Sequence, residues 1–152
     1  MGKEIERKFL VVGDGWLPLI EREMVIEQGY LVDDGIKNVR VRIIYEGGDI
    51  KSVVTIKSCN AGMTRDEYEF DIDYKSAVGM MTLASEGFLK KTRFVVPYKG
   101  NDWEVDVFPD LTIAELELES EDQEFETPDW VGEEVTHLKE YYNTELSKRN
   151  WV

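Results

Sequence analysis

The sequence predicts a mainly β fold in which antiparallel strands are interrupted by a few short helices. Many segments alternate apolar with ionic side chains, as in Val39-Arg40-Val41-Arg42, so each strand has one apolar and one charged face. Whole strands are also sorted by sign, into acidic ones such as 115–119 and basic ones such as 40–42. A solvated sheet face is the plain alternative, but sorting by sign favours a sheet that rolls its charged face inward around a site.

The first half of the chain is expected to form strands joined by tight turns. Residues 16–24 (WLPLIEREM) look like a short helix after the first strand. Glu46-Gly47-Gly48-Asp49 has the chemistry of a two-residue hairpin turn. The strands expected from alternation are 4–12, 26–32, 37–46, 50–58 and 67–72.

The second half is expected to open with a helix at 75–86, where apolar side chains recur at helical spacing. Asp73 is placed to cap this helix and Gly87 to end it. Ser120 and Gln123 form a capping-box pattern that predicts a short acidic helix. The strands expected between the two helices are 88–98, 101–108 and 112–119.

The composition indicates one acidic domain. The chain has 152 residues with 32 acids against 18 bases, a net charge of -14, and residues 1–152 are expected to fold as a single unit. This charge argues against nucleic-acid binding, which draws on a basic surface. A small polyanion can still bind if the bases converge inside, and a divalent cation then balances the charge.

The residue types that are scarce also exclude some classes of site. Cys59 and His137 are the single residues of their kinds, which excludes a disulfide framework, a thiolate zinc cluster and a histidine-rich metal site. The sequence has neither a signal-like apolar region nor a run of about 18 apolar residues. No membrane partner is therefore expected, and the cytoplasm is the expected location.

The segment Glu4-Ile5-Glu6-Arg7-Lys8 is the most informative part of the chain. As a strand it places Glu4, Glu6 and Lys8 on one face, with the two carboxylates starting roughly 7 Å apart. At an effective dielectric constant of about 20, two like charges at that distance repel by about 2 kcal/mol. The pair is close enough for both carboxylates to bind one divalent cation, which would offset the repulsion.

These motifs, taken in order, resemble the CYTH superfamily, also called the triphosphate tunnel metalloenzymes, and within it the short bacterial inorganic triphosphatases. The opening segment matches the ExExK signature of that family. The match covers nearly the whole chain and continues through Gln28-Gly29-Tyr30-Leu31, Val39-Arg40-Val41-Arg42, Thr55-Ile56-Lys57-Ser58, Arg65-Asp66-Glu67-Tyr68-Glu69, Lys91-Thr92-Arg93, Glu104-Val105-Asp106-Val107-Phe108, Glu115-Leu116-Glu117 and Gly132-Glu133-Glu134-Val135-Thr136.

The resemblance implies a closed, eight-stranded antiparallel β-barrel that forms a tunnel with a charged interior, with a few short helices packed outside. It also implies a hydrolase that uses Mg2+ or Mn2+ to cleave a terminal phosphate from inorganic triphosphate (tripolyphosphate) by in-line attack of water. The implied partner is this small polyanion, with neither nucleic acid nor membrane, and the reading is compatible with a homodimer.

Site residues carry over from the resemblance by matching positions. Tyr30 and Lys57 are the implied catalytic pair, a combination associated with cleavage of inorganic triphosphate. The implied phosphate-binding bases are Lys8, Arg40, Arg42, Lys57, Arg65, Lys91, Arg93 and Lys139, the last being the base kept after the Glu-Val-Thr segment. The implied metal-binding acids are Glu4, Glu6, Glu67, Glu69, Asp106, Glu115 and Glu117.

Several alternatives remain open on the sequence. The same fold could serve a thiamine triphosphatase, a nucleoside triphosphatase or a class IV adenylate cyclase. A non-catalytic module that binds polyphosphate or nucleotide would keep the bases and tolerate loss of the acids. The tail, 132–150, is expected to be helical in part, and it either plugs one tunnel mouth through Tyr141 and Trp151 or packs on the outer wall.

Overall fold

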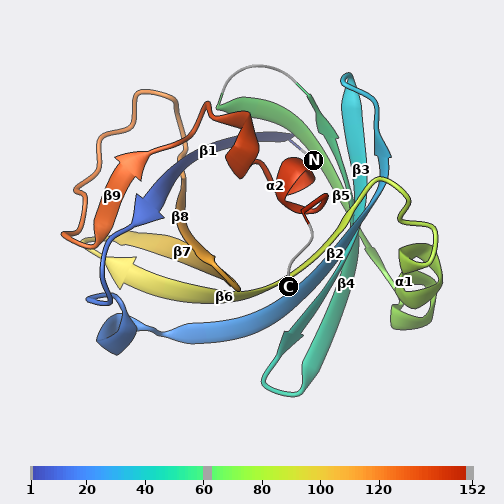
Figure 1. Ribbon diagram of the computed structural model, residues 1–152, viewed down its shortest axis with the longest axis horizontal. Helices are drawn as coiled ribbons and strands as arrows, with labels where there is room; N and C mark the ends of the chain where they lie inside the picture. Colours follow the sequence, from blue (N-terminus) through green and yellow to red (C-terminus); the bar gives the residue numbers. More distant parts are fainter. Residues whose placement is uncertain (1, 60–62, 150–152) are drawn as a thin grey trace.

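The strands close into an antiparallel barrel (Figure 1). The computed structural model describes residues 2–59 and 63–149, and within these ranges nine strands form one sheet in the order β5-β4-β3-β2-β6-β7-β8-β1-β9. An additional pairing of β5 with β1 closes eight of them into a ring, and β9 pairs with β1 alone. This confirms the eight-stranded barrel that the resemblance implied.

Eight strands follow the expected order with changes at their ends, and β9 is an additional strand at the start of the tail that was expected to be helical in part. The strands are β1 (Gly2–Val11), β2 (Arg22–Asp33), β3 (Lys37–Glu46), β4 (Asp49–Ser58), β5 (Thr64–Ile72), β6 (Phe88–Tyr98), β7 (Asn101–Phe108), β8 (Leu111–Glu117) and β9 (Val131–Glu134). The helical segments are η1 (Leu17–Leu19), α1 (Tyr74–Met81), η2 (Lys139–Tyr141) and α2 (Asn143–Leu146). In the described part of the chain, none of these helices has the length and apolar character needed to cross a membrane.

Strand β1 closes the barrel with its first half and is covered along its second half. Gly2–Ile5 pairs with β5, while Glu6–Leu10 pairs with β8 on the opposite edge. Strand β9 pairs with β1 at Phe9 and Val11, on the edge that β5 has left. Glu4, Glu6 and Lys8 therefore lie where β1 passes from one neighbour to the other.

The main hydrophobic core lies outside the barrel wall, because the inner faces of the strands carry the charges. Phe9 of β1 and Trp103 of β7 pack edge to face with ring centroids 5.5 Å apart, and Trp130 packs against Trp103 at 5.9 Å. Trp16, beside η1, joins the same buried cluster. The loops before β2 and before β9 thus cover the outer apolar face of β1, β7 and β8, which removes its apolar surface from water.

Helix α1 covers a second part of the outer wall (Figure 1). Ala77 of α1 packs with Val41 and Ile43 of β3 in a buried cluster. Asp73 caps the helix as expected, since its side chain accepts a hydrogen bond from the Ser76 N–H at 2.9 Å. The helix ends at Met81, so the expected extension to residue 86 is wrong, and Gly87 does not end it.

Two expected helices are wrong. Of residues 16–24, only Leu17–Leu19 is helical, as a single 3-10 turn, and β2 already begins at Arg22. Met24 and Ile26 are both buried on the inner face, and their spacing of two residues favours a strand over the short helix that the sequence pattern predicts. The capping-box pattern at Ser120 and Gln123 forms only a turn, in which the Gln123 side chain accepts the Glu119 N–H.

The extended path after this turn has a packing reason. Phe125 reaches back to the outer core, where its ring lies 5.9 Å from Trp103 and 6.3 Å from Phe9. The Arg7 guanidinium covers the same ring at 4.9 Å. These tertiary contacts hold the segment in an extended form that a local capping pattern does not predict.

Substitution of Gly29 tests how closely α1 and the residues after it pack against the barrel. A Cβ at this buried position would lie 2.6 Å from the Ala84 Cβ and 2.7 Å from the Met81 Sδ. We expect Gly29→Ala to lower the free energy of unfolding by about 1–3 kcal/mol through overpacking, measured by urea denaturation. Gly79→Ala in α1 is the control, because a Cβ there meets nothing within 4 Å, and about 1 kcal/mol of stabilisation is expected. Equal urea midpoints for both variants would contradict this reading.

Candidate active site in the barrel interior

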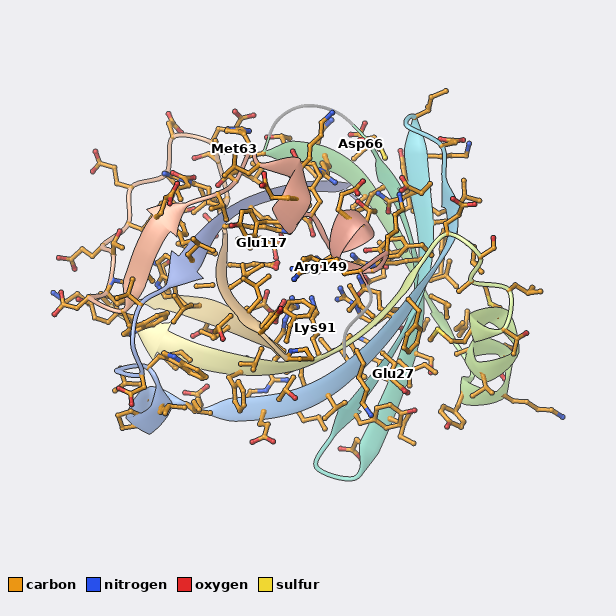
Figure 2. All side chains as sticks on the ribbon, in the orientation of Figure 1. Glu27, Met63, Asp66, Lys91, Glu117 and Arg149 are labelled. Carbon is orange, nitrogen blue, oxygen red and sulfur yellow. The ribbon has the colours of Figure 1, made fainter. Side chains whose placement is uncertain are left out.

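Strand register brings the charged residues together on the inner face of the barrel. Tyr30 and Gln28 of β2 lie opposite Arg40 and Arg42 of β3. Across the closing seam, Glu6 of β1 lies opposite Glu117 of β8 and Lys8 lies opposite Glu115. Figure 2 shows Lys91 and Glu117 inside the ring of strands. The period of two along each strand thus sends all of these groups into one interior.

Two adjoining pockets occupy this interior and share Glu4, Glu6, Arg40, Lys57 and Asn143. The first is also lined by Lys8, Tyr30, Asn38, Met63, Arg65, Thr136, Tyr142 and Thr144. The second is also lined by Arg42, Glu67, Glu69, Arg93, Glu104, Glu115 and Glu117. Of the sequence-predicted site residues, all except Lys91, Asp106 and Lys139 line one of these two pockets.

Lys57 links acids from two other strands. Its Nζ lies 2.7 Å from Glu4 Oε1 on β1 and 3.6 Å from Glu67 Oε2 on β5. The Lys57 side chain is largely buried. Glu4 and Glu67 line the second pocket together with Lys57, and Arg40 and Arg42 line the same pocket. Lys57 therefore contacts acids in a pocket that also holds bases.

Asp106 lies at the centre of a fully buried ion cluster. Arg93 donates to both of its oxygens, from Nε at 2.7 Å and from Nη2 at 2.9 Å, and Lys91 donates from Nζ at 2.7 Å. Burial alone would raise the pKa of Asp106, but the charges of Arg93 and Lys91 hold that pKa well below its usual range. The structure therefore places Asp106 between two bases, outside the two pockets.

Burial acts on the pKa of Lys91 in the opposite direction from its effect on Asp106, because it disfavours the charged form of each group. It lowers the pKa of Lys91 to about 8, although the charge of Asp106 acts to raise it. Lys91 also donates to the Asn143 Oδ1 at 3.3 Å. The lysine thus joins the barrel wall to the C-terminal segment.

The basic part of the interior fits an anion. Burial, followed by repulsion from Arg40 and Arg93, lowers the pKa of Arg42 to about 10. The Arg40 Nε is buried and has no hydrogen-bond partner among the residues that the structure describes. Guanidinium groups match phosphate oxygens with paired N–H donors, so these side chains suit a phosphate chain.

The acidic part fits a hydrated cation. Partial burial, together with repulsion from Glu4 and Glu104, raises the pKa of Glu117 to about 7, and a divalent cation relieves such crowding. Within residues 2–59 and 63–149, no set of three Asp, Glu, His or Cys side chains is already arranged to hold a metal ion. Mg2+ usually keeps several waters and takes one or two carboxylates plus substrate phosphates. The carboxylate donors therefore fit such an ion without a closed protein cage.

The C-terminal segment plugs one mouth of the barrel, and α2 lies over the opening in Figure 1. The Tyr142 ring lies 4.9 Å from the Arg65 guanidinium and 5.8 Å from the Lys8 Nζ. Lys8 also donates to the Tyr141 backbone oxygen at 3.1 Å. Leu146 of α2 is buried against residues from the inner faces of β6, β7 and β8. The plug is thus formed by Tyr142 and α2.

Other tail residues lie elsewhere. The Tyr141 side chain packs beside the Leu146 cluster instead of in the pocket. Trp151, the second residue expected at the mouth, lies outside the described residues. Lys139 is exposed on η2 and lines neither pocket, so the structure does not bring it to the other predicted bases.

Sequence reasoning missed several lining residues, and three of them were missed for different reasons. Glu104 alternates with Asp106 on β7, so the same face rule could have found it. Asn38 is uncharged, and a search for sorted charges passes over it. Tyr142 comes from a distant segment, and no local pattern signals that it returns to the barrel.

The Asp106 cluster predicts unequal effects of two substitutions. Asp106→Asn removes the carboxylate that Lys91 and Arg93 share. Arg93 keeps Glu104 at 3.2 Å and Glu115 at 3.6 Å, but Lys91 loses its 2.7 Å ion pair, and we expect the free energy of unfolding to fall by about 3–5 kcal/mol. Lys91→Met keeps the Arg93–Asp106 pair and removes a desolvated charge, so a much smaller loss is expected. Urea denaturation measures both values. Equal free energies of unfolding for Asp106→Asn and Lys91→Met would contradict this arrangement of the cluster.

The similarity to known proteins extends over nearly the whole chain. The family model described as CYTH domain matches residues 2–150. The curated inorganic triphosphatase of Acetivibrio thermocellus is 39% identical over 153 residues, which cover 97% of this chain and 95% of the relative. That of Nitrosomonas europaea is 38% identical over 154 residues, covering 95% and 96% respectively.

A solved structure shows the same architecture. The crystal structure of the inorganic triphosphatase NE1496 matches with a TM-score of 0.65 at 34% sequence identity. The match covers 99% of this chain and 97% of that chain. The likeness therefore includes all the strands that line the two pockets.

Proposed function

The chain belongs to the CYTH domain family, and on this premise we propose that it is a divalent-metal-dependent hydrolase of inorganic triphosphate. One observation supports the proposal most directly. Basic and acidic side chains line the same buried interior, and like charges crowd together around Arg42 and around Glu117. A chain of phosphates with bound metal supplies both missing counter-charges at once. The names of the two curated relatives, both inorganic triphosphatases, support the same substrate.

The bases are proposed to bind and orient the phosphate chain. Arg40, Arg42, Arg65 and Arg93 offer planar forks that match pairs of phosphate oxygens, whereas Lys8 acts as a compact point charge. Lys91 supports this set through Asp106 and Asn143 rather than by lining a pocket. Catalysis of phosphoryl transfer depends mostly on such positioning and charge neutralisation.

The acids are proposed to hold the metal, Mg2+ or Mn2+. When bound, the metal would neutralise phosphate oxygens and help to ready a water for in-line attack on the terminal phosphorus. Asp106 is better assigned to holding Lys91 and Arg93, because both of its oxygens already accept their hydrogen bonds. The proposed ligand donors are Glu4, Glu6, Glu67, Glu69, Glu115 and Glu117, with Glu104 added from the structure.

Tyr30 and Lys57 are the proposed catalytic pair. Both line the first pocket, and Lys57 also lines the second, beside the acids. Tyr30 is buried, at 1% exposed, so its hydroxyl acts in a site with little competing water. The pair is positioned to contact the phosphate that is cleaved, with Lys57 countering charge and Tyr30 donating a hydrogen bond.

The substrate assay tests the proposal directly. Phosphate and pyrophosphate release is measured from tripolyphosphate, ATP and thiamine triphosphate, each with Mg2+, Mn2+ or a chelator. We expect tripolyphosphate to be cleaved fastest and chelation to abolish turnover, because the acids need a cation to approach the substrate. Cyclic AMP formed without phosphate release would indicate a cyclase instead. Tight binding of tripolyphosphate without turnover in either metal would indicate a passive binder.

The role of Tyr30 is tested by removing one oxygen. We expect Tyr30→Phe to lower kcat for tripolyphosphate by about 10- to 100-fold, the loss expected for one hydrogen bond to a charged group. Tyr98→Phe is the control, because Tyr98 packs on the outer core and lines neither interior pocket. Unchanged turnover in Tyr30→Phe would return this tyrosine to a purely structural role.

A further inference from the structure

A chain of hydrogen bonds runs through the buried side chain of Gln28. Arg42 Nε donates to Gln28 Oε1 at 2.8 Å, and Gln28 Nε2 donates to the Tyr30 hydroxyl oxygen at 2.7 Å. Gln28 is 0% exposed. Arg42 and Gln28 lie opposite each other on β3 and β2, and Tyr30 is two residues further along β2 on the same face.

The chemistry of the arginine fixes the direction of this chain. A guanidinium group has donors only, so the Gln28 atom that faces it must be the carbonyl oxygen. The amide nitrogen of Gln28 must then face Tyr30, and the phenol oxygen must accept. The one proton of the Tyr30 hydroxyl is therefore not used toward Gln28 and remains free to point elsewhere.

Gln28 and Arg40 both present donors beside Tyr30, and the first pocket offers another direction for this proton. Arg40 is a second group without an acceptor to offer, and it lies opposite Tyr30 in the strand register. Tyr30 itself lines the first pocket together with Lys57.

The backbone around Tyr30 is held as firmly as its side chain. The Tyr30 backbone N–H donates to the Gly87 carbonyl oxygen at 2.9 Å, and the Tyr30 backbone carbonyl oxygen accepts from the Glu86 N–H at 3.1 Å. Gly29, between the two polar side chains, lets the segment after α1 pack directly on β2. These bonds fix the backbone at Tyr30, and burial of the side chain restricts the ring, so the main remaining freedom is rotation of the hydroxyl.

We propose that Gln28 is a positioning residue that makes the Tyr30 hydroxyl a hydrogen-bond donor toward the substrate phosphate. This inference rests on the proposed triphosphatase function and gives the Tyr30 hydroxyl a defined orientation within it. Without the amide, the phenol loses the donor that occupies its oxygen, and its proton is no longer directed into the pocket.

Gln28→Glu is the sharpest test, because it keeps the side-chain shape and reverses one hydrogen bond. The introduced carboxylate still accepts from Arg42, but it can only accept from Tyr30, so the hydroxyl proton turns away from the pocket. We expect kcat for tripolyphosphate to fall about as far as in Tyr30→Phe, by about 10- to 100-fold. In the double variant Gln28→Glu/Tyr30→Phe, kcat should be no lower than in Tyr30→Phe alone.

The added negative charge needs its own control. Asn38→Asp adds the same charge to the first pocket, where Asn38 is buried and its Nδ2 bonds Cys59. Its effect is expected mainly in KM, and that effect should persist in full when Tyr30→Phe is added. Gln28→Met removes the amide without adding charge, and its loss of kcat should be smaller, because the freed hydroxyl can still rotate to donate.

The outcomes separate this inference from the function on which it rests. Non-additivity of Gln28→Glu with Tyr30→Phe, with urea midpoints near wild type, supports the positioning role. Wild-type kcat in Gln28→Glu, or a loss that persists undiminished in the Tyr30→Phe background, overturns it while the triphosphatase function stands. Wild-type protein that releases no phosphate from tripolyphosphate overturns both. If Gln28→Glu does not fold, the same double-variant comparison with Gln28→Met decides.

Discussion

The structure depends on the balance of charges inside a closed sheet. Moving ionised side chains from water into a barrel interior costs several kcal/mol for each ion, and opposite charges offset this cost only when they are paired with good geometry. Asp106 meets that condition with Arg93 and Lys91, and Lys57 does so with Glu4. These pairs come from different strands, so each also ties one part of the barrel wall to another.

A charged interior moves the hydrophobic core to the outside of the wall. Trp103 and Phe9 face outward from their strands, and the segments that carry Trp16, Phe125 and Trp130 cover them. Helix α1 does the same over β3. The largest apolar cluster is therefore separate from the site, and a rigid outer layer holds the inner charges in place.

The charges that pairing leaves uncompensated give the interior its chemistry. Arg42 is crowded by Arg40 and Arg93, and Glu117 is crowded by other glutamates, so the folded chain holds both signs under strain. Such preorganised charge costs no reorganisation when substrate and metal arrive. Tyr142 at one mouth lies over Lys8 and Arg65, two other bases of the interior, so the tail forms part of the site.

Alternation along each strand was enough to predict which residues share a face, because the side-chain period of two is a local property of the backbone. That rule predicted Glu4, Glu6 and Lys8 together, and it applies equally to Glu104 beside Asp106. It could not predict which strands meet across the interior, so only the tertiary structure decided that Asp106 holds two bases and that Tyr142 returns to the mouth. Contacts between distant segments depend on strand order and loop paths, and one sequence read locally contains neither.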